Sequence, residues 1–111
     1  MRTTIATTDG KAVEVEVTFT SGTWTVVEQY TENGATYYNV SHTPTGMRLC
    51  LCRTQKTAEW ACRQAAMYMR PELDVVPFGV DPRTVLDHMT LTALAREKKR
   101  ICAGVEKRDE V

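Results

Sequence analysis

Apolar and polar residues alternate along the first half of the chain, which is the pattern of β-strands with one buried face. One run of this kind covers residues 13–19, where Val13, Val15, Val17 and Phe19 alternate with Glu14, Glu16 and Thr18. The same period of two returns near residue 50, in a stretch whose alternating residues are Met47, Arg48, Leu49, Cys50, Leu51 and Cys52. We therefore expect strands throughout residues 3–53.

Turn signals divide this region into short strands. Asn33-Gly34 supplies the left-handed backbone of a tight hairpin, and Asp9-Gly10 does the same near the N-terminus. A third turn falls at 43–46, and the strands between the turns cover 3–8, 23–30 and 36–42. Because the loops are short, the sequence predicts an antiparallel meander of four or five strands.

The spacing of apolar residues changes at Thr54 from the period of two typical of strands to the spacing typical of helices, and we expect two helices in the rest of the chain. Small apolar residues at helical spacing predict a helix over 55–70, which Pro71 ends. Residues 73–76 are too short to assign and fit an edge strand. Asp81 followed by Pro82 predicts the start of a second helix over 82–102, packed in the same layer or extending beyond it, with a frayed tail over 104–111. The fold class is thus α+β, with residues 1–111 as a single domain.

The second helix carries more apolar surface than one contact with a sheet requires. One row consists of Leu91, Leu94 and Ile101, and the other of Val85, Met89 and Ala93. Such a helix either lies between two layers or offers one row to another chain.

Charge and composition then narrow the classes of function. The chain has 14 basic and 14 acidic residues, which disfavours nucleic-acid binding because phosphate contacts usually require a basic excess. Residues 55–111 hold ten of the basic and nine of the acidic groups. No apolar run reaches the roughly 18 residues of a membrane span, and the first ten residues lack the apolar centre of a secretory signal. We expect a cytoplasmic protein with no membrane contact.

The residues that could carry chemistry form no familiar motif. Cys50, Cys52, Cys62 and Cys102 lack the two close pairs of a typical zinc site, so free thiols packed as small hydrophobic groups are preferred over a metal site or a disulfide. His42 and His88 have no flanking catalytic motif, and there is no glycine-rich phosphate loop. The sequence predicts no enzyme, no cofactor, no metal and no catalytic residue.

The candidate partner-binding residues come from one charged run and from the strands. The run at 96–100 contains Arg96, Lys98, Lys99 and Arg100, and it either solubilises the end of the helix or docks an acidic partner. Tyr37 and Tyr38 point to opposite faces of their strand, so one of them lies outside the main core. We take the four basic residues together with Tyr37 and Arg48 as the predicted partner-binding set.

Two local resemblances fall on residues 23–70. The stretch Thr54-Gln55-Lys56-Thr57-Ala58 and the alanines that follow it resemble the last helix of double-stranded-RNA-binding domains. The strand with Trp24 and the helix with Trp60 are similar to the arm domains of phage integrases. Both resemblances imply nucleic-acid binding. This chain departs from them, since strands replace the opening helix of the RNA binders and the strands carry few basic residues.

The layout as a whole is similar to that of small phage and mobile-element proteins, including anti-CRISPR inhibitors. That resemblance implies an inhibitor that acts by occluding a surface of a host protein. The preferred hypothesis is a non-enzymatic protein-binding module, in the form of a phage or mobile-element inhibitor of a host defence or regulatory complex. The alternatives are a small nucleic-acid-binding module and a homo-oligomerising accessory protein.

Overall fold

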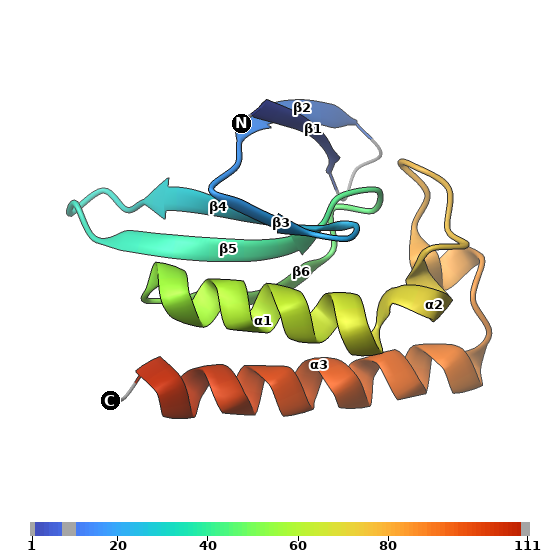
Figure 1. Ribbon diagram of the computed structural model, residues 1–111. Coiled ribbons are helices and arrows are strands. Elements are labelled where there is room, and N and C mark those ends of the chain that lie inside the picture. Colours follow the sequence, from blue (N-terminus) through green and yellow to red (C-terminus); the bar gives the residue numbers. More distant parts are fainter. Residues whose placement is uncertain (1, 8–10, 110–111) are drawn as a thin grey trace.

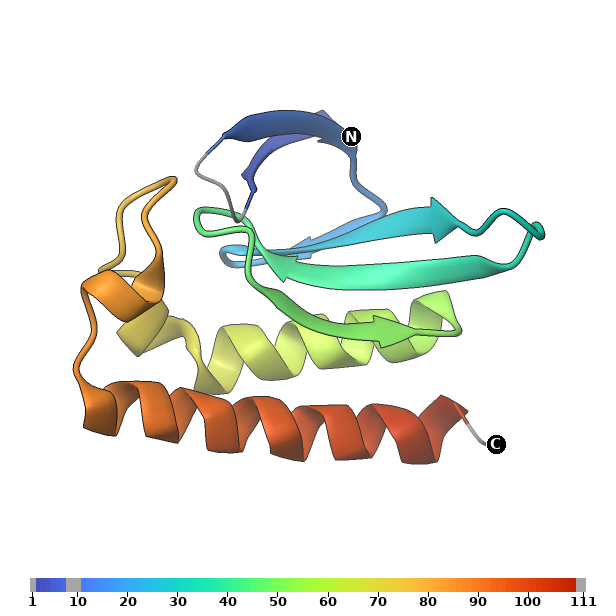
Figure 2. The ribbon, with the colours of Figure 1, turned by 180° about the vertical axis from the view of Figure 1, so that it is seen from behind.

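The fold consists of three layers, seen edge-on in Figure 1. The computed structural model describes residues 2–7 and 11–109, apart from the side chains of residues 70 and 71. The elements in chain order are β1 (Arg2–Ala6), β2 (Ala12–Glu16), β3 (Phe19–Ser21), β4 (Trp24–Tyr30), β5 (Thr36–His42), β6 (Arg48–Cys52), α1 (Gln55–Tyr68), α2 (Arg70–Leu73), the 3-10 helix η1 (Pro82–Thr84) and α3 (His88–Asp109). The β1–β2 hairpin covers one face of the β3–β6 sheet, and α1 and α3 lie side by side under the other face (Figures 1 and 2).

The larger sheet is an antiparallel meander in the order β3-β4-β5-β6. Gly34, with φ of 84°, supplies the left-handed conformation in the turn between β4 and β5. In the hairpin, Ile5 pairs with Val13, while the predicted Asp9-Gly10 turn lies outside the described residues. The α+β class, with an antiparallel meander followed by helices, is confirmed.

The main core lies between the sheet and the helices. Trp24, Val26 and Val40 face the helices from the sheet and are fully buried. Opposite them, α1 presents only small or medium side chains: Ala58, Ala61, Cys62 and Ala65. Small side chains on α1 let the helix lie close to the sheet, as the alanine spacing predicts.

The first helix begins as predicted and ends two residues early. The Thr54 hydroxyl caps α1 by accepting a hydrogen bond from the backbone N–H of Thr57, at 3.1 Å. The helix ends at Tyr68, and the separate turn α2 then covers 70–73. An edge strand at 73–76 was the wrong interpretation, because Val76 donates a backbone hydrogen bond to the carbonyl of Leu73 and closes a turn.

The second helix is displaced from its predicted bounds. Asp81 caps only η1, through a 2.9 Å bond from the backbone N–H of Arg83. α3 starts six residues after Pro82, where Asp87 accepts a 2.7 Å bond from the backbone N–H of Thr90. Two competing cap signals lie close together, and the chain bends between them.

The C-terminal part of α3 also corrects the predicted frayed tail. Residues 104–109 are helical, because Val105 is buried and Asp109 accepts a 2.9 Å hydrogen bond from the backbone N–H of Arg53. The basic run 96–100 consequently lies in the middle of α3 and not at its end. Neither long helix within 2–7 and 11–109 is apolar enough over a sufficient length to cross a bilayer.

Candidate protein-binding surface

One end of the molecule exposes an unusual share of large apolar side chains. Nine such side chains are exposed in the described part of the chain, and six of them fall within residues 67–89. This segment forms the end of the molecule where α1 stops, α2 and η1 turn, and α3 starts (Figure 1). We call this set the apolar end; its members are Met67, Tyr68, Val75, Phe78, Val85 and Met89. Clustered exposed apolar residues mark an interaction surface more often than scattered ones do.

The apolar end includes Val85 and Met89, two members of the second apolar row predicted for the second helix. Leu94 and Ile101 are buried against the sheet and α1, whereas Met89 is 82% exposed and Ala93 is also exposed. The two apolar rows predicted for this helix therefore have different environments. In the first row, Leu94 and Ile101 pack into the core and Leu91 is half-buried, whereas the second row faces outward.

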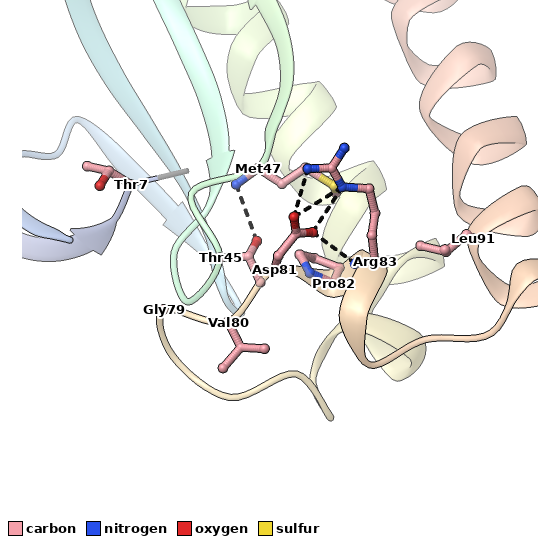
Figure 3. Close-up of a pocket in the computed structure, with 9 residues that line it drawn as sticks. All are labelled: Thr7, Thr45, Met47, Gly79, Val80, Asp81, Pro82, Arg83 and Leu91. Atoms are coloured by element: carbon pink, nitrogen blue, oxygen red, sulfur yellow. Dashed lines mark hydrogen bonds and ion pairs between the residues drawn. The ribbon is translucent and has the colours of Figure 1, made fainter. Parts of the chain in front are cut away.

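A cavity of about 270 Å³ lies beside the apolar end (Figure 3). Its walls come from the hairpin, the β5–β6 turn, the loop before η1, η1 itself and α3: Thr7, Thr45, Met47, Gly79, Val80, Asp81, Pro82, Arg83 and Leu91. The two charged residues of the wall pair with each other, since Arg83 Nη2 lies 2.7 Å from Asp81 Oδ2. Hydrogen bonds from Arg83 lower the pKa of Asp81. The remaining wall is mostly apolar and suits an apolar side chain more than a charged ligand.

The Thr45 hydroxyl in the cavity wall serves the β5–β6 turn. It accepts a 3.2 Å hydrogen bond from the backbone N–H of Met47 and lies 2.9 Å from Nδ1 of His42. His42 is fully buried, and burial lowers its pKa to about 4. A neutral, buried imidazole that holds a turn is a structural element of the sheet.

In the described part of the chain, three arginines of α1 and α3 lie over aromatic rings. The guanidinium of Arg100 lies 4.8 Å from the ring centroid of Tyr68, and that of Arg108 lies 4.1 Å from the ring of Trp60. Arg63 covers the Phe19 ring in the same way, at 5.5 Å. Stacking restricts these side chains, so less conformational entropy is lost when they bind an anion.

The helical layer is basic although the chain is neutral. α1 and α3 together contain eight Lys and Arg residues but only four Asp and Glu residues, an excess of four positive charges. The rest of the chain carries the compensating negative excess. The net charge of zero for the whole chain does not reveal that the positive charges are concentrated on the helices.

Only two of the six predicted partner-binding residues adjoin the apolar end. Arg96 and Tyr68 line one surface depression between α1 and α3, and Arg100 stacks on Tyr68. Lys98 lies on the other side of α3, where its charge acts on the Cys102 thiol, and Lys99 is exposed.

The two predicted residues from the strands lie elsewhere. Tyr37 borders a depression with Arg53 and Asp109 at the opposite end of α3. Arg48 lies beneath the hairpin, on the face of the sheet away from the helices. The predicted set therefore does not form a single surface.

Most of the apolar end was not predicted from the sequence. Met67 and Tyr68 lie off the alanine face of α1, which is the one signal that could have identified them. Val75 and Phe78 lie in a connecting segment without periodicity, where exposure cannot be read from the sequence.

The four cysteines are free thiols. The Sγ atoms of Cys50 and Cys52 lie 3.8 Å apart, well beyond the roughly 2.05 Å of a disulfide. A hydrogen bond with Cys52 and burial raise the pKa of Cys50, and burial raises that of Cys62 to about 12. Among the described residues, no three His, Cys, Asp or Glu side chains are grouped so that they could hold a metal ion.

Comparisons with protein-family models, curated proteins and solved structures give no match for this chain.

Proposed function

We propose that this chain is a non-enzymatic protein-binding module that covers an acidic-rimmed apolar surface of another protein. The observation that carries the proposal is the apolar end, with six exposed apolar side chains beside a mostly apolar cavity and next to the stacked Arg100. Protein interfaces are enriched in aromatic residues, Met and Arg, and their strongest contacts are anchors seated in pockets.

The two parts of the surface have different physical roles. Burial of Phe78 and Met89 against a partner removes apolar area from water and supplies affinity. Arg96 and Arg100 attract a negatively charged rim and chiefly raise the rate of association. Occlusion by such contacts needs no reaction, so the module acts stoichiometrically, as an inhibitor of a host defence or regulatory complex does.

Nucleic-acid binding is the second candidate, favoured by the positive excess of α1 and α3. Two of the three stacked arginines already face carboxylates: Arg100 lies 2.9 Å from Glu97, and Arg63 lies 3.9 Å from Glu59. These internal pairs compete with phosphate and with a partner's carboxylates alike. Exposed apolar side chains decide between the candidates, since they contribute little to phosphate binding and much to a protein interface. The protein partner is therefore preferred.

A differential pull-down from bacterial lysate tests the proposal. The baits are the native chain, a Phe78→Ser/Met89→Ser variant and a Tyr30→Ser control; Tyr30 is 71% exposed but lies at the far end of β4. We expect at least one protein to be retained by the native and control baits and lost with the double variant. Equal retention by all three baits contradicts the proposal. Nuclease-sensitive capture of nucleic acid would instead establish the second candidate, and sedimentation of the pure chain as a dimer would identify the surface as a self-association site.

A further inference from the structure

A second cleft lies between the hairpin and the outer face of the larger sheet, away from the helices. Its volume is about 460 Å³, within the range of small-molecule sites. Figure 2 shows the hairpin on one side of the sheet and α1 and α3 on the other. The cleft is lined by Ile5, Ala6, Thr7, Val13, Val15, Val27, Gln29, Asn39, Ser41, Gly46 and Arg48.

One end of the cleft is closed by a close approach of two backbone segments. The backbone N–H of Ala6 donates a 3.0 Å hydrogen bond to the carbonyl of Thr43. Gly46 has a φ of 71°, and a Cβ there would clash with the carbonyl of Ala6. Ile5 and Ala6 are buried at this end. The hairpin is thus fixed to the β5–β6 turn, while part of the apolar surface of the hairpin stays open.

The two walls of the cleft differ in polarity. The hairpin contributes valines, of which Val13 is 45% exposed even though it faces the sheet. The floor contributes polar groups, with Ser41 Oγ 3.1 Å from Asn39 Oδ1. A polar floor under an apolar wall leaves valine surface that the protein itself does not cover.

Among the described residues that line the cleft, Arg48 is the only charged one. It makes no ion pair with any described residue. In the described part of the hairpin, the nearby acidic residues Glu14 and Glu16 are on the outer face and pair with Arg2 at 3.2 and 3.5 Å. The cleft therefore offers a free guanidinium beside apolar surface.

We propose that this cleft binds a small amphipathic monoanion, with its apolar body against Val13, Val15 and Val27 and its carboxylate on Arg48. A guanidinium binds a carboxylate through paired, charge-assisted hydrogen bonds, which fixes the orientation of the ligand. The apolar body gains free energy by leaving water. This site is independent of the apolar end, which lies on other elements.

Titration of the ¹⁵N-labelled chain with decanoate, followed by backbone amide NMR shifts, tests the proposal. We expect saturable shifts in β1, β2 and the outer-facing residues of β4–β6, with a Kd below about 1 mM. Arg48→Gln should weaken decanoate binding about tenfold and leave binding of uncharged decanol unchanged. Arg53→Gln, at an exposed arginine outside the cleft, is the matched control and should bind decanoate like the native chain.

The decanoate titration of the native chain is by itself able to contradict the proposal. The test therefore does not depend on whether a variant folds. Decanoate shifts that do not saturate, or that map to α1 and α3, would show that the cleft is not a ligand site. Equal weakening by Arg48→Gln and Arg53→Gln would show that Arg48 has no specific role. Neither result bears on the apolar end.

Discussion

At the scale of single residues, Gly104 determines how closely α1 and α3 approach. A Cβ at this position would clash with Cη2 of Trp60 and lie 3.0 Å from Cζ3. Arg108, four residues further along α3, stacks on the same ring, with its guanidinium 4.1 Å from the ring centroid. The glycine is therefore required by packing between the helices and not by backbone conformation.

We expect Gly104→Ala to destabilise the protein, although alanine favours a helix by about 1 kcal/mol over glycine. Overpacking lowers the free energy of unfolding by about 1–3 kcal/mol, which exceeds the gain in helix propensity. We therefore expect the free energy of unfolding to fall by about 1 kcal/mol and the Tm by about 4 °C. The measurement is thermal unfolding followed by circular dichroism. In a Trp60→Leu background the clash is absent, and the same substitution should raise the Tm; a rise in the native background would contradict this account of Gly104.

His42 makes the stability of the fold depend on pH. Burial holds its pKa at about 4 in the folded chain, against 6.5 in the unfolded chain, and the nearby Asp74 only partly opposes this effect. Below pH 6.5 the unfolded chain binds a proton that the folded chain does not bind until about pH 4. The stability that the neutral His42 side chain contributes is fully present above pH 6.5 and is lost as the pH falls towards about 4.

The free energy of unfolding should therefore decrease by about 3 kcal/mol through this one group as the pH falls across that window. Urea unfolding at a series of pH values measures it. His42→Gln should be less stable at neutral pH, because the bond to Thr45 is altered, but its stability should vary less with pH. Identical pH profiles for the two proteins would show that His42 is not the titrating group.

At the scale of elements, α3 divides the basic run between two sides of the helix. Arg96 and Arg100 are four residues apart and both adjoin Tyr68, whereas Lys98 lies on the opposite side near Cys102. We expect Arg96→Glu/Arg100→Glu to slow association with the protein partner by about 10- to 100-fold at low salt. Lys98→Glu/Lys99→Glu changes the net charge equally and should have a much smaller effect.

Stopped-flow association with the purified partner, at low and high salt, measures both variants. The difference between them should shrink as salt screens the charges. If both variants slow association equally, net charge alone matters, and the position of Arg96 and Arg100 beside Tyr68 has no specific role.

The sequence predicted those elements whose signals are local. Alternation predicted the strands, except that the run over 13–19 is divided between β2 and β3, which belong to different sheets. The alanine spacing and the Thr54 cap predicted α1 to within two residues. The start of α3 was missed because Asp81 and Asp87 are both good caps, and only packing decides which one begins the long helix. The tail was missed because its order depends on the contact of Asp109 with Arg53, 56 residues earlier in the chain.

At the scale of the whole molecule, the excess of positive charge lies on α1 and α3, and most of the exposed apolar side chains lie at one end of the molecule. Val85 and Met89 belong to a row that was predicted from its periodicity, but the other four members of the apolar end come from α1 and from a loop without a pattern. The position of the hairpin over the sheet was likewise not predictable, since it rests on contacts such as that of Gly46 with Ala6. Because of this hairpin, Arg48 lines a separate cleft and does not belong to the helical surface.

The central claim, that the apolar end contacts another protein, is tested most directly by site-specific photocrosslinking in bacterial lysate. A photoreactive residue is placed at Phe78, at Met89 or at the control position Tyr30, all of which are exposed. We predict adducts with the same foreign protein from positions 78 and 89 and none above background from position 30. Equal adducts from all three positions, or adducts from position 30 alone, would contradict the claim.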